Sequence, residues 1–527
     1  MILSVPHPSR VVCAKGGFLR SNGSILRSPF SPFRFPLRYN TNVLIPLRRV
    51  LLSLSIPFFF VSCSKPHPAA IAIIHVTVID ATGAPPQPNS TVLLEGSKIS
   101  AVGPDSSLRI PPGAQIIDAT GKFLIPGLAD MHVHLTGAGE PSGSREFILP
   151  LLIANGVTTV RDMGGDVALL KKLKTEIDSG DQLGPKIFFT GPYLDGNPPS
   201  FQPSIVVQTP AEAFAAVHKL KFEGVDFIKV QSRLKPDAYF AIAAAARKEY
   251  IHFVGHVPDS ISPAQASDAG QFSIEHLTGI LLACSSKEEE LRQQQLSPPA
   301  RKESPRQTSL RQRAWQQAVL DTYSPQKARQ LYAKFLANHT WQVPTLPLLI
   351  ELAYLTPAKN RANDPHMKYI PQNLQNVWKR GRAESLANKS PDDFLLRAKL
   401  VEASLKAVGD MQAAGIPIMA GTDSTAPNLV PGYALHDSIA DLVRAGLTPM
   451  EALQTATSKP AEFLNRASEQ GKIAPGQRAD LVLLDANPLE DIHNTQKINA
   501  VILKGKLLDR GALDAYLASA AQFAAKR

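Results

Sequence analysis

The stretch KFLIPGLADMHVHL, residues 122–135, decides the fold of this 527-residue chain. It is an apolar run that ends in two histidines one residue apart, and side chains alternate between faces along an extended strand. His132 and His134 therefore share one face, while the apolar residues around them occupy the other. Such a pair is either structural or part of a metal site, so its role depends on partners elsewhere in the chain.

The charge of the chain is concentrated at its N-terminus. The formal net charge is +11, but residues 1–70 hold nine Lys or Arg and no Asp or Glu. The rest of the chain has 47 basic residues (56 minus nine) against 45 acidic ones, a net charge of +2. The basic composition therefore gives no support for a nucleic-acid partner.

The N-terminal segment has the pattern of a targeting signal. Arg48 and Arg49 precede VLLSLSIPFFFVSC, a run too short to span a bilayer that ends at Cys63. FVSC resembles a bacterial lipoprotein cleavage box, which predicts export to the cell envelope and a lipid anchor at Cys63. A signal would begin near Val43, so a start downstream of Met1 and a transit peptide, with a cytoplasmic or organellar protein, remain alternatives.

Cysteine usage gives the fold no disulfide to depend on. With Cys13 removed and Cys63 lipidated, Cys284 is left alone. We therefore expect a fold without an intramolecular disulfide.

Short strand patterns occur at both ends of the remaining chain. Residues 71–121 and 471–509 alternate apolar and polar residues between turn signals, and each is too small to close a core. Both ends are therefore expected to build one discontinuous small β-sandwich domain. The predicted boundaries are as follows: targeting segment 1–68, β domain 69–122 and 471–512, central domain 123–470, and a C-terminal helix or tail 513–527.

The central region alternates strand-like apolar runs with helical stretches, the signature of βα units and a parallel sheet. Eight runs occur in order: GLADMHVHL, NGVTTVRDMG, PKIFFTGPY, GVDFIKVQS, IHFVGHV, QFSIEHL, TWQVPTL and GIPIMAGTD. This predicts an α/β fold, a (β/α)8 TIM-like barrel. Two polar insertions, 285–335 and 351–400, are either solvated surface helices or a cover over the barrel mouth.

Functional groups of a TIM barrel lie at the C-terminal ends of its strands. That rule separates His256, at the end of its run, from His252 at the start of the same run. It also selects Lys229, His276 and Asp423. Together with His132 and His134, these residues form a candidate cluster of six.

The chain from Ile71 to about Leu508 resembles the amidohydrolase superfamily, especially imidazolonepropionase-like and prolidase-like metal-dependent hydrolases. The resemblance rests on FLIPGLADMHVHL, GVTTVRDMG, FIKV, GHV, SIEHL, GTD, AGLTPMEALQTAT and GKIAPGQRADLVLLD.

The resemblance implies a metal centre of two divalent ions, with zinc expected. His132 and His134 would bind the more buried ion, and His256 and His276 the more exposed one. Lys229 would bridge them as a carbamate, which, unlike an ammonium group, offers anionic oxygens to a metal.

The expected reaction is hydrolysis of a C–N bond in an amide or cyclic amide by metal-activated hydroxide. Asp423 would ligate metal and act as the catalytic proton shuttle. A mononuclear deaminase of the same superfamily is an alternative, although such enzymes generally lack the bridging lysine. The second alternative is a catalytically inactive barrel that serves as a binding module.

The substrate is expected to be a small molecule of undetermined identity. VQSRLKPDAYF follows Lys229 where the carboxypeptidase branch is Gly-rich, which argues against a dipeptide. Tyr193, Arg233, Tyr239 and His436 are the candidate substrate-binding residues. Membrane contact is expected only through the lipid anchor, and homo-oligomerisation stays open.

Overall fold

The computed structural model describes residues 70–136, 143–297, 299, 302–353, 361–387 and 389–527. The predicted targeting segment, with Cys63, lies outside these ranges. Within them, no helix is both long enough and apolar enough to cross a membrane.

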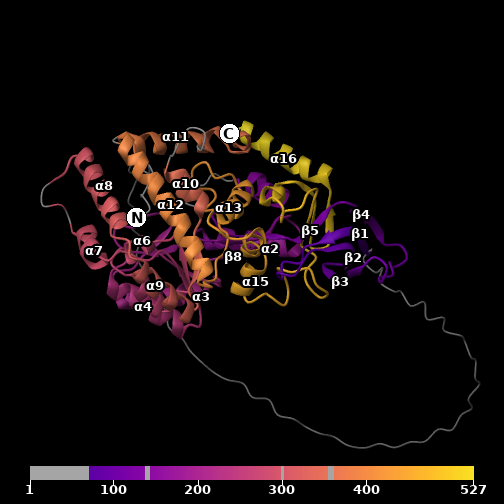
Figure 1. The fold of residues 1–527 in the computed structure, drawn as a ribbon, viewed down its shortest axis with the longest axis horizontal. Helices are drawn as coiled ribbons and strands as arrows, with labels where there is room; N and C mark the ends of the chain where they lie inside the picture. The colour runs from indigo at the N-terminus through magenta and orange to yellow at the C-terminus, as the bar shows by residue number, and fades with distance from the viewer. Residues whose placement is uncertain (1–69, 137–142, 298, 300–301, 354–360, 388) are drawn as a thin grey trace, which may run out of the picture. The chain divides into compact units, whose positions relative to one another are not determined.

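One mixed sheet combines strands from the two ends of the described chain. Its order is β17-β16-β15-β5-β1-β2-β3, and β4 pairs with β1. Strands β1 to β5 lie side by side in Figure 1. The strands are β1 (Ile71–Val78), β2 (Gln87–Glu95), β3 (Lys98–Pro104), β4 (Gln115–Asp118), β5 (Phe123–Pro126), β15 (Leu481–Leu484), β16 (Ile498–Leu503) and β17 (Lys506–Leu508).

The junction between the two chain ends is the antiparallel pair β5–β15, in which Pro126 lies opposite Leu481. Buried Val, Ile and Leu side chains from both ends form a core on this sheet. The shared sheet is what a discontinuous β domain requires, while the domain boundaries and the sandwich arrangement stay predictions.

The central region contains two parallel sheets of short, buried strands. The first has the order β6-β7-β8 and the second β10-β9-β11-β12-β13-β14. Strands buried on both faces read as continuous apolar runs, which is why these segments stood out in the sequence. The strands are β6 (Leu128–Val133), β7 (Val157–Asp162), β8 (Lys186–Phe189), β9 (Tyr193–Asp195), β10 (Ser204–Val206), β11 (Ile228–Val230), β12 (Phe253–Gly255), β13 (Ser273–Glu275) and β14 (Trp341–Val343).

The eighth predicted strand, GIPIMAGTD, does not form a regular strand. It is joined to its neighbours by two isolated parallel bridges, Gln342 to Ile418 and Val133 to Ser424, and by scattered backbone hydrogen bonds such as that from Met131 N–H to the Ala420 carbonyl. Pro417 has no N–H to donate to a ladder, and Asp423 has a left-handed backbone (φ 64°), so the extended pairing is interrupted. The α/β class and parallel strands are as expected, but a continuous eight-stranded ladder is absent from the described residues.

Helices surround these parallel strands, and their apolar faces form the largest core. Several begin with a matched cap, such as α3, where Thr209 and Glu212 form a capping box and Pro210 opens the first turn. The helices are α1 (Leu149–Ala154), α2 (Val167–Ser179), α3 (Pro210–Phe222), α4 (Pro236–Lys248), α5 (Pro263–Asp268), α6 (Ile280–Ala283), α7 (Glu288–Leu296), α8 (Pro305–Asp321), α9 (Pro325–Ala337), α10 (Leu346–Ala353), α11 (Gln372–Leu386), α12 (Pro391–Ala413), α13 (Tyr433–Arg444), α14 (Pro449–Thr455), α15 (Ser458–Phe463) and α16 (Arg510–Ala525).

The two polar insertions contain helices that pack on one another. The first supplies α7, α8 and most of α9, and the second supplies α11 and the start of α12. Helix α8 packs against both α7 and α12 (Figure 1). Helices α7, α8 and α12 also line a cavity beside the predicted metal ligands, which favours a cover over the site rather than helices solvated on all sides.

Candidate active site

All six residues of the predicted cluster come together at the C-terminal ends of the parallel strands. The ring centroids of His132 and His134 are 5.5 Å apart, and those of His132 and His276 are 4.5 Å apart. The His256 and His276 rings lie edge to face at 4.9 Å. Lys229 Nζ is 3.5 Å from His132 Nε2, and Asp423 Oδ1 is 2.9 Å from His134 Nε2.

In each of the four histidines, Nδ1 already forms a hydrogen bond with a neighbouring oxygen. The pairs are His132 with Glu275 Oε2 (2.8 Å), His134 with the Gly164 carbonyl (3.1 Å), His256 with Ser232 Oγ (2.9 Å) and His276 with Thr345 Oγ1 (2.6 Å). Metal-binding histidines characteristically use the other ring nitrogen in this way. The Nε2 atoms are therefore the nitrogens left for a ligand.

The donor set fits a divalent cation. Ligand atoms of His132, His134 and Asp423 all lie within 4.8 Å of one another. Imidazole nitrogens and a carboxylate are ligands that zinc accepts. Burial and the charge of Lys229 hold the pKa of His132 and His256 well below 6.5, and burial lowers the pKa of His276 to about 3. These imidazoles are therefore neutral, the form that ligates a metal.

The Lys229 side chain is only 1% exposed and lies 5.9 Å from the centroid of the Tyr193 ring. No carboxylate of the described residues lies within ion-pair distance of its Nζ. Burial lowers the pKa of Lys229 to about 8. Burying a charged ammonium group without an ion-pair partner costs free energy. A purely structural role therefore does not explain Lys229.

Asp423 faces the cluster with both carboxylate oxygens. Its Oδ1 is 3.4 Å from His132 Nε2, and its Oδ2 is 4.0 Å from His276 Nε2. Burial alone would raise the pKa of Asp423, but its hydrogen bond with His134 and the nearby positive charges lower it below 3.8. His276 (φ 58°) and Asp423 (φ 64°) both have left-handed backbones, a strained state that concentrates at functional sites.

A buried ion pair that the sequence analysis missed lies behind His132. Arg161 NH2 donates to both Glu275 oxygens at 2.9 and 3.1 Å, and neither side chain is exposed. The guanidinium also lies 5.0 Å from the Phe463 ring centroid. The sequence does carry a signal for it, since the charged residues Arg161 and Asp162 end the apolar run VTTVRD.

The four candidate substrate-binding residues have different surroundings. Tyr193 lies beside the cluster, with its hydroxyl 3.5 Å from His134 Nδ1. Gly164 makes room for it, because a Cβ at that glycine would lie 2.3 Å from the Tyr193 ring. Arg233 lines the cavity, and its NH1 donates to the Pro198 carbonyl at 3.0 Å.

Tyr239 and His436 lie outside the lining of the cavity, so the structure gives them no contact with it. Tyr239 is fully buried on α4, where its hydroxyl donates to Gln271 Oε1 at 2.7 Å. His436 is 1% exposed on α13, and its Nδ1 is 3.1 Å from Thr495 Oγ1. Both belong to the packing of helices on the outside of the strands.

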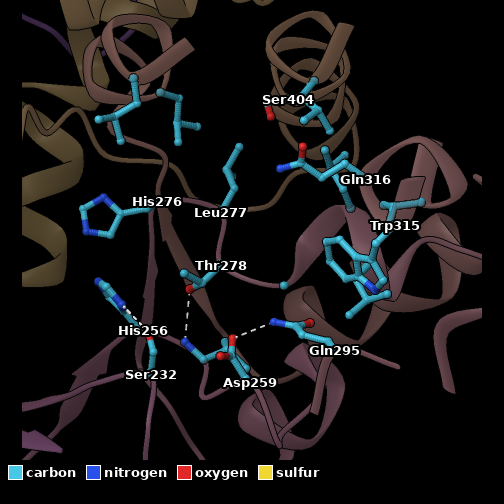
Figure 2. A pocket seen from close by; sticks show the side chains of 18 of the residues that line it. Ser232, His256, Asp259, His276, Leu277, Thr278, Gln295, Trp315, Gln316 and Ser404 are labelled. Carbon is cyan, nitrogen blue, oxygen red and sulfur yellow. Dashed lines mark hydrogen bonds between the residues drawn. The ribbon is translucent and has the colours of Figure 1, made fainter. Parts of the chain in front are cut away.

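A cavity of about 360 Å³ opens beside the cluster. His256 and His276 lie on one side, and Trp315 and Gln316 face them from α8 on the other (Figure 2). Pockets of this size accept small organic molecules. The candidate metal-ligating cluster therefore lies at one wall of a cavity large enough for a small organic molecule.

The sequence pattern of the Amidohydrolase family matches residues 364–508. An adenine deaminase from Paracoccus denitrificans (strain Pd 1222) is 35% identical over 74 residues, 14% of this chain and 12% of that protein. Ochratoxinase from Aspergillus niger is 36% identical over 115 residues, 21% of this chain and 23% of that protein. These alignments thus span less than a quarter of either relative.

Among solved structures, bottromycin amidohydrolase aligns with a TM-score of 0.67 at 21% identity, covering 87% of this chain and 91% of that one. At this identity the likeness shows the fold. Residues 364–508 carry the pattern of the Amidohydrolase family, and the predicted resemblance to amidohydrolases is confirmed.

Proposed function

We propose that this protein hydrolyses the C–N bond of an amide or cyclic amide with the help of divalent metal ions. The observation that carries the proposal is the convergence of four histidines, each with its Nδ1 engaged, on Lys229 and Asp423. A site built only for stability would not need so many imidazoles around a buried lysine.

His132, His134 and Asp423 would hold one ion, and His256 and His276 a second. Lys229, as a carbamate, would supply an oxygen ligand to each. Divalent ions held there polarise a carbonyl group and acidify water, which is the chemistry that amide hydrolysis requires. The imidazole-rich donor set supports zinc as the metal.

Asp423 is the group placed to move the proton. Its carboxylate lies among three imidazoles, and the lowered pKa leaves it ionised and able to accept a proton from the attacking water. The same oxygen can return that proton to the departing nitrogen, which would otherwise leave as a poor anion.

The two alternatives fit the geometry less well. A mononuclear deaminase would have no use for a buried lysine 3.5 Å from a ligand histidine. A binding module without activity would have no need for all six groups, nor for the strained backbones of His276 and Asp423.

Metal analysis and hydrolysis together test the proposal. Purified protein treated with zinc and bicarbonate should hold close to two divalent ions and cleave members of a screen of N-acyl amino acids, dipeptides and hydantoins. Lys229→Ala should lose at least one ion and the activity, whereas Lys171→Ala, an exposed lysine on α2, should change neither. A fully active protein with one ion that is indifferent to Lys229→Ala would contradict the binuclear site.

We also propose export and a lipid anchor at Cys63, on the support of the Arg48–Arg49 pair, the short apolar run and the FVSC pattern. Expression in a bacterium supplied with labelled fatty acid should give a membrane-associated, labelled protein. Cys63→Ser should abolish the label and Cys284→Ser should leave it unchanged. A label that survives Cys63→Ser would show the anchor to be elsewhere.

A further inference from the structure

One face of α8 is turned toward the cavity. Gln312, Trp315, Gln316 and Val319 all line it, and their spacing of i, i+3, i+4 and i+7 places them on one side of a helix. Helix α8 belongs to the first polar insertion, so the wall opposite the metal ligands is formed by a segment outside the strand and helix alternation of the fold (Figure 2).

This wall is apolar at its centre. Trp315 packs with Leu281, Leu282 and Val319 in a small cluster of apolar side chains. Its indole Nε1 donates to the Leu291 carbonyl at 2.8 Å, which fixes the ring in one position. A rigid aromatic side chain gives a large apolar contact area at little cost in conformational entropy.

The polar side chains that α8 turns toward the cavity are neutral, and their amide groups are free to bond a ligand. Across the described residues, the side-chain amides of Gln312 and Gln316 have no hydrogen-bond partner, although both line the cavity. The charged lining groups already contact protein atoms. Arg292 donates to the carbonyls of Asp259 and Ile261, and Asp259 accepts from Gln295 Nε2.

We propose that this α8 face is a substrate subsite for a bulky, uncharged aromatic group that carries a neutral hydrogen-bonding atom. The assignment rests on the proposed amide hydrolysis and adds the class of substrate. A group of naphthalene size fits within the cavity of about 360 Å³ that His256, His276 and Trp315 line. An acetyl or methyl group would leave the apolar wall in contact with water, so small dipeptides are poor substrates.

Two matched pairs of compounds test this on the metal-loaded full chain. N-(2-naphthoyl)glycine against N-acetylglycine enlarges the acyl half, and N-acetyl-3-(2-naphthyl)alanine against N-acetylalanine enlarges the amine half. At least one naphthyl compound should exceed its small partner in kcat/KM by roughly tenfold or more, the least that extra apolar contact in such a pocket is worth. Trp315→Ala should remove that preference, mainly through KM, with the small partner changed by less than about threefold.

Leu310→Ala is the matched control, since Leu310 lies on α8, is 45% exposed and is not part of the cavity wall. It should keep the preference. The inference is overturned if neither naphthyl compound is favoured, or if the preference survives Trp315→Ala.

Failure of the proposed function would appear as no hydrolysis of any of the four compounds by the metal-loaded protein. In that case binding of 2-naphthamide, measured by calorimetry, decides the subsite. Binding to the wild type that weakens about tenfold or more in Trp315→Ala, but not in Leu310→Ala, supports it. No binding, or equal binding to wild type and Trp315→Ala, overturns it.

Discussion

Glu275→Gln is expected to damage both the stability of the protein and its hold on metal. The Glu275 carboxylate is completely buried and accepts hydrogen bonds from His132 Nδ1 (2.8 Å), Arg161 NH2 and Ser273 Oγ (2.5 Å). A carboxamide offers one acceptor oxygen and one NH2 group. At least one of the three donors would therefore face another donor.

Two effects set the size of the change. The substitution leaves the Arg161 charge buried without a counter-charge, which costs about 3–5 kcal/mol in the free energy of unfolding. It also removes the carboxylate that orients His132, and loss of such a partner lowers metal affinity about 10- to 100-fold.

Urea unfolding of metal-free protein measures the first effect, and zinc titration against a competing chelator measures the second. Glu469→Gln is the control, because its carboxylate pairs with Arg466 and Lys186 while 39% exposed. That variant should change stability by less than about 1 kcal/mol and leave metal affinity unchanged. A Glu275→Gln protein within 1 kcal/mol of the wild type, with normal zinc affinity, would refute the positioning role.

Three further substitutions probe other parts of the molecule. Asp423→Asn should keep the fold and most of the metal but lower kcat about 10²- to 10⁴-fold, and near-normal turnover with both ions bound would remove it from the mechanism. Gly164→Ala should lower stability by about 1–3 kcal/mol and reduce activity, because its Cβ displaces Tyr193, whereas Gly180→Ala, with a left-handed backbone but open space, should cost stability alone. Burial raises the pKa of Asp441 to about 7 from 3.8, so the folded state keeps a proton that the unfolded state loses, and stability falls as pH rises between these values. Asp441→Asn should therefore be more stable than the wild type at pH 8 but not at pH 4 by urea unfolding, and a pH-independent difference would contradict this.

The α/β class, most of the parallel strands and the cluster could be predicted because they depend on local patterns, whereas β9 and β10 were missed. Period-two alternation placed His132 and His134 on one face, and the rule for strand ends separated His256 from His252. The structure agrees with that separation, since His256 joins the cluster while the His252 ring stacks on Phe272 at 3.9 Å.

What could not be predicted depends on contacts between distant segments. The eighth strand looked regular, yet Pro417 and the left-handed Asp423 interrupt its pairing. Tyr239 lies a short distance after strand β11 in the sequence. It belongs to helix α4, however, and its side chain lies on the buried face of that helix. The cavity wall joins α8 to α12, whose packing no local pattern encodes.

The pairing of β5 with β15 gives the chain an unusual order of assembly during synthesis. Lys122, next to β5, forms an ion pair with Asp485, 363 positions later in the chain. Strand β5 leads directly into β6, which carries the first metal ligands, so the edge that anchors this segment is completed only when nearly the whole polypeptide has left the ribosome. Contacts of such long sequence separation slow folding. The nascent protein therefore exposes an unpaired, apolar β5 edge for most of its translation, and this edge is where a chaperone would be needed.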